Sequence, residues 1–461
     1  MITTNIGKLF LETYNKNKSA DYTPKLFFTE VFYPLFFDHE KYMMTGGNSP
    51  LENPKISWGK MILGQVPFET KEKRRKRYEN FMEGIAQGNA GMNLAIGYPS
   101  LDIFATTSGQ ISGNTFFASE DDAYLSWIGA ALGTCVEGGQ TLFFLDSEIL
   151  FNIYEGWSMY RQHLNNDEKL AGNQIAAWNA RWLLYRYSYE YEEDNHGNFI
   201  QEFSNELENN KDGIKRISTV SWPRVLAGIA KNRKDNSRLL CYICNIGQTN
   251  TTYGFIPFVL DEIRKPIDLY KKFFGMEEGK KAESLWGLKL GIACQEGSIG
   301  LKAMVPYKLI EEFEREKAKN AHQWGMVHKL IEEFPEKEIN YSEKNKTKFN
   351  TYKIWVMSML NNNKEQNNEA LYKKTELLAE TLINYSNAAA KAKTTNANKV
   401  NAVLESKNKK SFIEALAAIV AEVDDEQKKL IIEIVKLVNN LPADNVPYFI
   451  TLLKFNFAAK R

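Results

Sequence analysis

Cysteine and histidine are scarce in this chain of 461 residues, which holds four cysteines and five histidines. So few cysteines over such a length do not form the disulfide framework of a small secreted domain. Cys241 and Cys244 make a Cys-x-x-Cys pair, but no second pair and no His-x3-His follow at zinc spacing. Because the run 239–246 reads as a strand, we expect two core cysteines there, no metal or other cofactor, and a reducing compartment.

Long apolar runs are also missing. A membrane-spanning helix needs about 20 apolar residues, and the longest candidate, 412–423, is interrupted by Glu414 and Glu422. The opening residues MITTNIGKLF lack the basic start and apolar core of a secretion signal. We therefore expect a cytoplasmic protein with no membrane partner.

The short motifs of common enzymes are absent from the sequence. There is no Gly-x-Ser-x-Gly elbow, no phosphate-binding Gly-x4-Gly-Lys-Ser/Thr loop and no Gly-x-Gly-x-x-Gly. Acidic clusters at 120–122 and 146–148 stand where helices are expected to begin, and carboxylates are favourable at a helix N-terminus. We expect helix capping and no catalytic residue. The enzymatic alternative is a metal-dependent nuclease that uses Asp121, Asp122 or Asp146 with Glu148.

No strong charge excess of either sign is present. Lys and Arg total 58 against 57 Asp and Glu, which excludes a wholly basic, histone-like binder. The hydrophobic share of 43% is that of a folded chain. Residues 302–461 carry 26 Lys and Arg against 21 Asp and Glu, and the excess is concentrated between about 344 and 410. Any nucleic-acid surface must therefore be a local patch.

The apolar pattern predicts an α+β fold, with a mixed α/β region over 1–301 followed by an all-α helical bundle over 302–461. Short apolar runs in the first region predict strands, at 57–63, 92–96, 141–145, 239–246 and 253–259. Helices are predicted from Thr23-Pro24, where Pro34 should end or kink the helix, and at 119–131, 147–163 and from 167 through 184. The aromatic-rich stretches 27–37 and 178–191 are expected to lie in the core.

Helical periodicity is the only clear signal in the second region. Leu371, Leu378, Leu382 and Tyr385 share one helix face. Ser411-x-x-Glu414 fits a capping box, and Asp424-Asp425 suits the start of another helix. Residues 387–410, biased toward Asn, Ala and Lys, are either a loop or a helix.

The clearest anomaly is the segment 70–87, TKEKRRKRYENFMEGIAQ. Tyr78, Phe81, Met82 and Ile85 follow helical spacing, so we expect an amphipathic helix. Positive charge at a helix N-terminus opposes the helix dipole, and phosphates would make the arrangement favourable. A solvated basic turn, or contact with acidic residues of a partner protein, are the alternatives. The basic residues of its first turns are Lys71, Lys73, Arg74, Arg75, Lys76 and Arg77.

Two polar, glycine-containing segments complete the predicted DNA contact. Glycine lets backbone N–H groups approach a phosphate, and Asn, Gln, Lys and hydroxyl side chains can contact bases or backbone. Ordered surface loops are the alternative for both segments. The candidate residues are Gly46, Gly47, Asn48, Asn53, Lys55 and Lys60 in the first segment, and Thr107, Ser108 and Gln110 in the second.

Three stretches, at 26–58 (LFFTEVFYPLFFDHEKYMMTGGNSPLENPKISW), 95–112 (AIGYPSLDIFATTSGQIS) and 123–133 (AYLSWIGAALG), are similar to a known family. They resemble the large subunit of type I CRISPR effector (Cascade) complexes. The match covers roughly the first quarter of the chain, and beyond it the resemblance is one of layout, a mixed region followed by a helical bundle.

The resemblance implies a non-catalytic subunit of an RNA-guided antiviral complex. Such a subunit recognises the motif flanking the target in double-stranded DNA, helps separate the strands and recruits a separate helicase-nuclease. Its partners would be the guide RNA and other Cascade subunits. The helical region would resemble the small subunit, which binds the displaced strand, and the candidate contacts there are Lys391, Lys393, Lys399, Lys407, Lys409 and Lys410.

Overall fold

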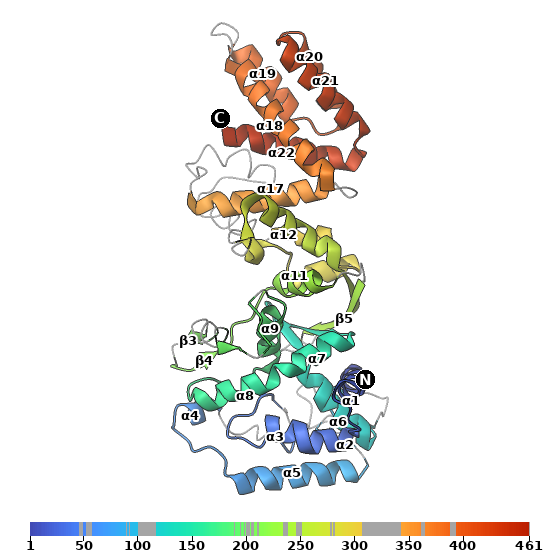
Figure 1. The fold of residues 1–461 in the computed structure, drawn as a ribbon, viewed down its shortest axis with the longest axis vertical. Coiled ribbons are helices and arrows are strands. Elements are labelled where there is room, and N and C mark those ends of the chain that lie inside the picture. Colours follow the sequence, from blue (N-terminus) through green and yellow to red (C-terminus); the bar gives the residue numbers. More distant parts are fainter. Residues whose placement is uncertain are drawn as a thin grey trace. The chain divides into compact units, whose positions relative to one another are not determined.

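The chain forms two compact units in the computed structural model, Met1–Leu260 with Cys294–Ser298, and Asp261–Ala293 with Ile299–Arg461. The fold is α+β: the first unit combines helices with a small antiparallel sheet, and the described part of the second is helical (Figure 1). The structure describes residues 1–45, 49–51, 58–88, 90–91, 93–99, 117–188, 190–193, 195–197, 199, 203, 207–209, 212–233, 238–245, 251–276, 279, 282–306, 343–360, 365–387 and 393–460.

The division between the units falls after Leu260, whereas composition places a boundary near residue 302. Helix α12 (Leu260–Phe274) explains the difference, because it continues directly from the sheet and packs against the helical unit. Phe273 of α12, for example, contacts Tyr372 with 5.8 Å between ring centroids. The second unit therefore begins with α12, about 40 residues before the boundary that the sequence pattern predicts.

Helices make up most of the first unit. They are α1 (Ile2–Lys18), α2 (Pro24–Phe27), a π-helical segment η1 (Phe28–Phe32), α3 (Tyr33–Phe36), α4 (Trp58–Ile62), α5 (Lys71–Ala86), α6 (Glu120–Ala131), α7 (Ser147–Glu155), α8 (Trp157–Asn166), α9 (Ile175–Arg186) and α11 (Trp222–Asn232), with a short 3-10 turn η4 (Cys294–Glu296).

The sheet has four antiparallel strands in the order β1-β2-β5-β6. They are β1 (Thr134–Val136), β2 (Gln140–Phe144), β5 (Arg238–Asn245) and β6 (Thr251–Val259), and β3 (Glu208–Asn209) pairs separately with β4 (Lys215–Arg216). The strands predicted at 141–145, 239–246 and 253–259 are thus confirmed. Cys241 is buried in β5 and Cys244, beyond a register shift, is half-buried. No metal-binding group of three His, Cys, Asp or Glu occurs among the described residues.

Aromatic side chains fill the core of the first unit. Phe27, Phe28, Phe32 and Phe36 are all completely buried, which confirms the core assignment of 27–37. Of the two outcomes predicted at Pro34, the helix does not end there, since α3 continues through Phe36. The helix is irregular instead, with the π-helical segment immediately before α3. Thr23 caps α2 as predicted, accepting a hydrogen bond from the Leu26 N–H at 3.2 Å.

Two predicted strands are wrong. Residues 58–62 form helix α4, and 93–97 form turns in which the Leu94 and Ala95 N–H groups both donate to the Gly91 carbonyl. Apolar runs this short do not separate a strand from a buried helical turn. The helix predicted over 147–163 is broken at Gly156, where a Cβ would lie 2.4 Å from the Trp182 ring. The next helix begins at Ile175, later than the predicted 167.

The second unit is a helical bundle. It contains α12, η3 (Glu283–Leu285), α14 (Leu290–Ala293), η5 (Leu301–Met304), α17 (Glu343–Leu360), α18 (Glu365–Asn387), α19 (Lys393–Leu404), α20 (Lys409–Val420), α21 (Asp425–Asn440), η6 (Ala443–Asn445) and α22 (Val446–Lys460). The predicted face of α18 is buried, and Asp424 caps α21 as expected. No helix within the described ranges is long and apolar enough to cross a bilayer.

The capping box of α20 differs from the predicted one. Asn408 is the N-cap: its side chain accepts from the Ser411 N–H at 3.0 Å, and the Ser411 hydroxyl accepts from the Asn408 N–H at 3.3 Å. The expected pair Ser411 and Glu414 fails because the helix already begins at Lys409. The biased segment 387–410 contains helix α19.

Candidate nucleic-acid interface

Helix α5 forms as the periodicity of 70–87 predicts. The Thr70 side chain caps it by accepting from the Lys73 N–H at 3.4 Å. Phe81 and Ile85 are buried, and Phe81 stacks on Phe28 of the π segment with 5.4 Å between centroids. Packing at this end therefore fixes the helix to the core and leaves its amino-terminal turns at the edge of the unit.

Two arginines of α5 turn inward and are held by the protein. Arg77 pairs bidentately with the Glu69 carboxylate, with its Nη2 at 2.7 Å and its Nε at 2.9 Å from the two oxygens. Glu69 raises the pKa of Arg77 through this hydrogen bond. Arg74 donates from Nη1 to the Glu69 carbonyl at 2.7 Å and lies 3.7 Å from Asp38. These arginines position the start of the helix.

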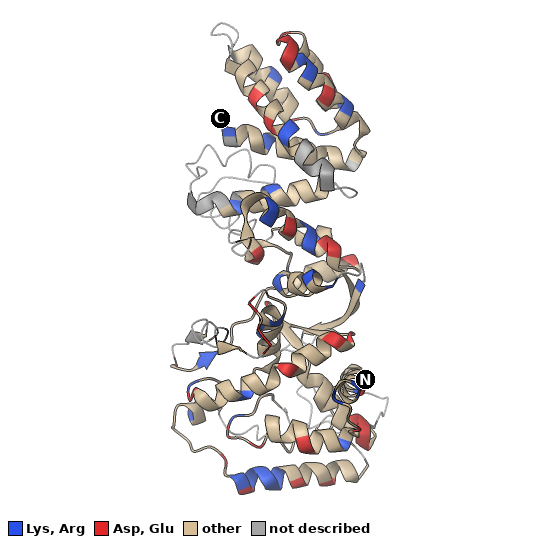
Figure 2. Ribbon diagram, viewed as in Figure 1, with Lys and Arg blue, Asp and Glu red and all other residues tan. Residues whose placement is uncertain are grey.

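The remaining basic side chains of the first turns face outward. Lys71, Lys73 and Lys76 are exposed, and Arg75, whose side chain is 80% exposed, pairs with the exposed Glu79 one turn later. Figure 2 shows that the Lys and Arg positions, coloured blue, gather at one end of α5. An exposed ion pair of this type contributes little energy. The outer face is therefore an electropositive helix end, which we call the basic face: Lys71, Lys73, Arg75 and Lys76.

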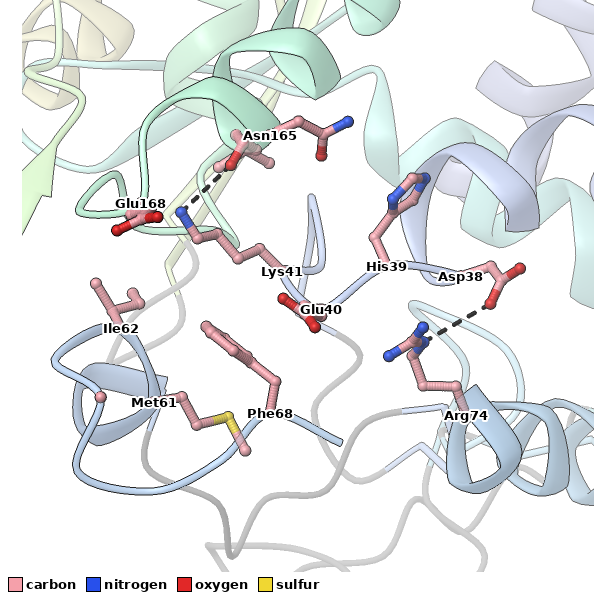
Figure 3. A pocket seen from close by; sticks show the side chains of 12 residues that line it. Asp38, His39, Glu40, Lys41, Met61, Ile62, Phe68, Arg74, Asn165 and Glu168 are labelled. Carbon is pink, nitrogen blue, oxygen red and sulfur yellow. Dashed lines mark hydrogen bonds and ion pairs between the residues drawn. The ribbon is translucent and has the colours of Figure 1, made fainter. Parts of the chain in front are cut away.

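A cavity of about 600 Å³ opens beside the inward face of α5 (Figure 3). One wall is the segment 38–41 after α3, a second comes from α4 and residues 64–68, and a third from the end of α8 at 164–168. Arg74 closes the remaining side. The cavity thus belongs to the first unit and shares Arg74 with the helix that carries the basic face.

Buried cations hold the 38–41 wall in place. Arg161 donates to the carbonyls of Leu35 and Lys41, both at 2.9 Å, and to that of Phe36 at 3.4 Å. Burial lowers its pKa to about 10, which leaves it charged at neutral pH. Lys41 donates to the carbonyls of Leu164 and Asp167 at 3.3 and 2.6 Å, so its charge meets the carboxyl end of α8.

His39 lies on the same wall and is neutral at physiological pH. Burial, together with the charge of Arg161, lowers its pKa to about 4. Its ring and the Asn165 amide therefore add two neutral donor–acceptor groups to a cavity whose remaining polar side chains, those of Asp38, Glu40, Lys41, Arg74 and Glu168, are charged.

Most of the predicted glycine-loop contacts lie outside the described residues. This applies to Gly46, Gly47, Asn48, Asn53 and Lys55, and to Thr107, Ser108 and Gln110. Lys60 is described, and is exposed on α4.

The lysines predicted to contact a displaced strand fall into two groups. Lys407 is exposed, and the side chain of Lys410, 3.8 Å from Glu414, is 85% exposed. Lys399 is bound to Glu422 at 2.6 Å, and Lys409 donates to the carbonyls of Asn439 and Leu441 at 2.8 Å each. Lys391 and the side chain of Lys393 lie outside the description.

The acidic clusters act as helix starts. Asp146 caps α7 by accepting from the Ile149 N–H at 3.0 Å and is paired with Arg233. Asp121 and Asp122 lie in the first turn of α6, which Ser119 caps. Asp146 therefore both caps a helix and pairs with a cation.

Sequence reasoning missed the cavity. Its polar residues come from three separate places in the sequence, 38–41, 74 and 165–168, so no local spacing brings them together. The signal that was present is the run Asp38-His39-Glu40-Lys41, four polar residues placed directly after a buried aromatic helix. Comparison with protein-family models, with curated proteins and with solved structures found no match to this chain.

Proposed function

We propose that this chain is a non-catalytic subunit of an RNA-guided DNA surveillance complex, which contacts duplex DNA through the basic face of α5. The observation that carries the proposal is the division of the basic residues of α5. Arg74 and Arg77 anchor the helix, while Lys71, Lys73 and Lys76 remain exposed. Lysines presented on a fixed helix end can neutralise phosphates, and the counterions released supply the binding energy.

The finer role is proposed on the resemblance to Cascade large subunits. In that role the chain recognises the motif flanking the target, helps open the strands and recruits a separate helicase-nuclease. The exposed Lys407 and Lys410 of the helical unit are the contacts proposed for the displaced strand.

Removing the charges of the basic face tests the proposal. We expect the triple variant Lys71→Gln, Lys73→Gln, Lys76→Gln to lower the affinity of the full chain for duplex DNA. Because each lost phosphate contact changes the slope of log K against log salt by roughly 0.9, that slope should shrink by about 2.7. Fluorescence anisotropy of a labelled duplex, measured from low to moderate salt, gives both quantities.

Helix α1 offers a matched control, since Lys8, Lys16 and Lys18 are also three exposed lysines on one helix. Their triple replacement by Gln removes the same net charge and should leave the salt slope unchanged. Equal losses from the two triple variants would mean that only net charge matters, and would refute a site on α5.

A further inference from the structure

The cavity beside α5 contains a hydrogen-bond donor that has no acceptor. The Nε of Arg74 is buried, and no group among the described residues accepts a hydrogen bond from it. The nearest carboxylate, that of Asp38, lies 3.7 Å away, which is beyond hydrogen-bond range. A buried donor left unpaired is costly, and Arg74 itself lines the cavity. A ligand that accepts from the Arg74 guanidinium would supply an acceptor that the described residues do not provide.

Acceptors and an aromatic ring complete the lining. Asp38, Glu40 and Glu168 contribute three carboxylates, against the two cations Lys41 and Arg74. Figure 3 shows the ring of Phe68 projecting between Met61 and Ile62 on one side and Glu40 on the other. The cavity thus offers an apolar and aromatic surface bordered by carboxylates, by the neutral side chains of His39 and Asn165, and by the Arg74 guanidinium.

This composition disfavours an anion and suits a flat, uncharged ring. Three carboxylates facing two cations would repel a phosphate, and both hydrogen bonds of Lys41 go to backbone carbonyls. A nucleobase has a face that can stack on Phe68 and an edge with donors and acceptors. Guanine fits best, because N7 and O6 accept from arginine while N1–H and the amino group donate to carboxylates.

We propose that this cavity binds a single unpaired nucleobase, guanine in preference, with Arg74 and the carboxylates on its edge and Phe68 on its face. The volume of about 600 Å³ is in the range of small-molecule sites. That the base comes from a DNA strand opened next to the basic face rests on the function proposed above. That a base binds in the cavity rests on the cavity alone.

The test uses the full chain and four probes, the monophosphates GMP, AMP, CMP and TMP, titrated by calorimetry; in each of them only the uncharged base is expected to enter the cavity, with the phosphate left in solvent. We expect GMP to bind at least tenfold tighter than TMP. Phe68→Leu removes the stacking surface and Glu168→Gln removes a carboxylate at constant shape, and each should weaken GMP at least fivefold. Phe68 is half-buried and Glu168 is exposed, so neither substitution should unfold the chain. Circular dichroism of each variant checks that the fold is kept.

The two proposals fail separately. The triple lysine variant should bind GMP like the wild-type chain, and Phe68→Leu should bind paired duplex like the wild-type chain. Equal binding of all four monophosphates, no GMP binding at millimolar concentration, or GMP binding lost only in the triple lysine variant would overturn the base site.

A second pair of probes identifies the source of the base. A duplex with one unpaired guanine beside it should bind more tightly than the fully paired duplex, and Phe68→Leu should remove the difference. GMP binding without any gain from the unpaired guanine would overturn the DNA origin and assign the cavity to a free nucleotide.

Discussion

Arg161 is the residue on which the wall of the cavity depends. Its guanidinium is almost completely buried and donates to the carbonyls of Leu35, Phe36 and Lys41. Those carbonyls belong to the end of an aromatic helix and the segment that follows it, so one side chain ends the helix and shapes the site.

Replacing Arg161 by Met should therefore destabilise the first unit. Three buried acceptors lose their donor, at a cost of about 1–3 kcal/mol for each that water cannot reach, and we expect a total near 3 kcal/mol. Denaturant unfolding followed by tryptophan fluorescence measures this. Arg216→Met is the control, because Arg216 makes an exposed i,i+4 pair with Asp212. Equal stability of the two variants would contradict the structural role of Arg161.

Like Arg161 in the first unit, Lys353 in the second unit is a cation that is largely buried. Its ammonium lies over the ring of Tyr372, 3.9 Å from the centroid, and is hydrogen-bonded to the Tyr372 hydroxyl. Burial lowers its pKa from 10.5 to about 8. The folded chain therefore gives up this proton more readily than the unfolded chain does.

This difference predicts a rise in stability at alkaline pH. Between pH 8 and about 10.5 the unfolded chain retains a proton that the folded chain has lost, so the free energy of unfolding increases with pH, by up to about 3 kcal/mol. Lys353→Met should lack this increase. Urea unfolding at several pH values tests it, with the exposed Lys429→Met as the charge-matched control. A parallel pH profile for wild type and Lys353→Met would refute it.

At the scale of elements, the crossing of α1 and α6 depends on two glycines. A Cβ on Gly7 would lie 2.1 Å from the Leu125 carbonyl oxygen, and one on Gly129 would lie 1.8 Å from that of Thr3. Both distances are far inside contact range, and in both cases the obstacle is backbone. The two helices touch main chain to main chain, and neither can admit a methyl group without moving apart.

Gly7→Ala and Gly129→Ala should each destabilise the first unit by several kcal/mol, because a crossing that is forced apart leaves voids around it. Their effects should not add: once one methyl group has separated the helices, the second meets less resistance. Thermal or urea unfolding of the two single variants and the double variant measures this. Strictly additive losses would show that the two positions act at independent contacts.

Local signals predicted the elements better than the site. Thr23, Ser119 and Asp424 cap helices as their spacing to the following residues indicates, because a cap is decided within one helical turn. The runs at 141–145 and 239–246 were rich enough in β-branched, aromatic and other apolar residues to identify strands. The run at 57–63 was not, and its packing context made it a helix.

Over the whole molecule, the sequence predicts where charged residues gather, but not which of them are paired within the protein and which face solvent. The basic residues of α5 follow one another in the chain, yet Arg74 and Arg77 turn to Glu69 and Asp38 while Lys73 and Lys76 face outward. That partition depends on the position of the helix on the aromatic core. For the same reason the cavity, whose lining is spread from residue 38 to residue 168, has only the polar run 38–41 as a local signal.

The arrangement of the sheet has a consequence for the order of assembly during synthesis. Strand β2 lies between β1 and β5, and Phe144 is opposite Cys241, so nearly a hundred residues separate these neighbours. The hairpin of β1 and β2 leaves the ribosome with one edge unpaired, and that edge stays open until β5 has emerged. The helices α7, α8 and α9, which form from nearby contacts, are made in this interval. Closure of the sheet is thus a late, long-range step, and until it occurs the nascent chain carries an exposed strand edge that a chaperone could cover.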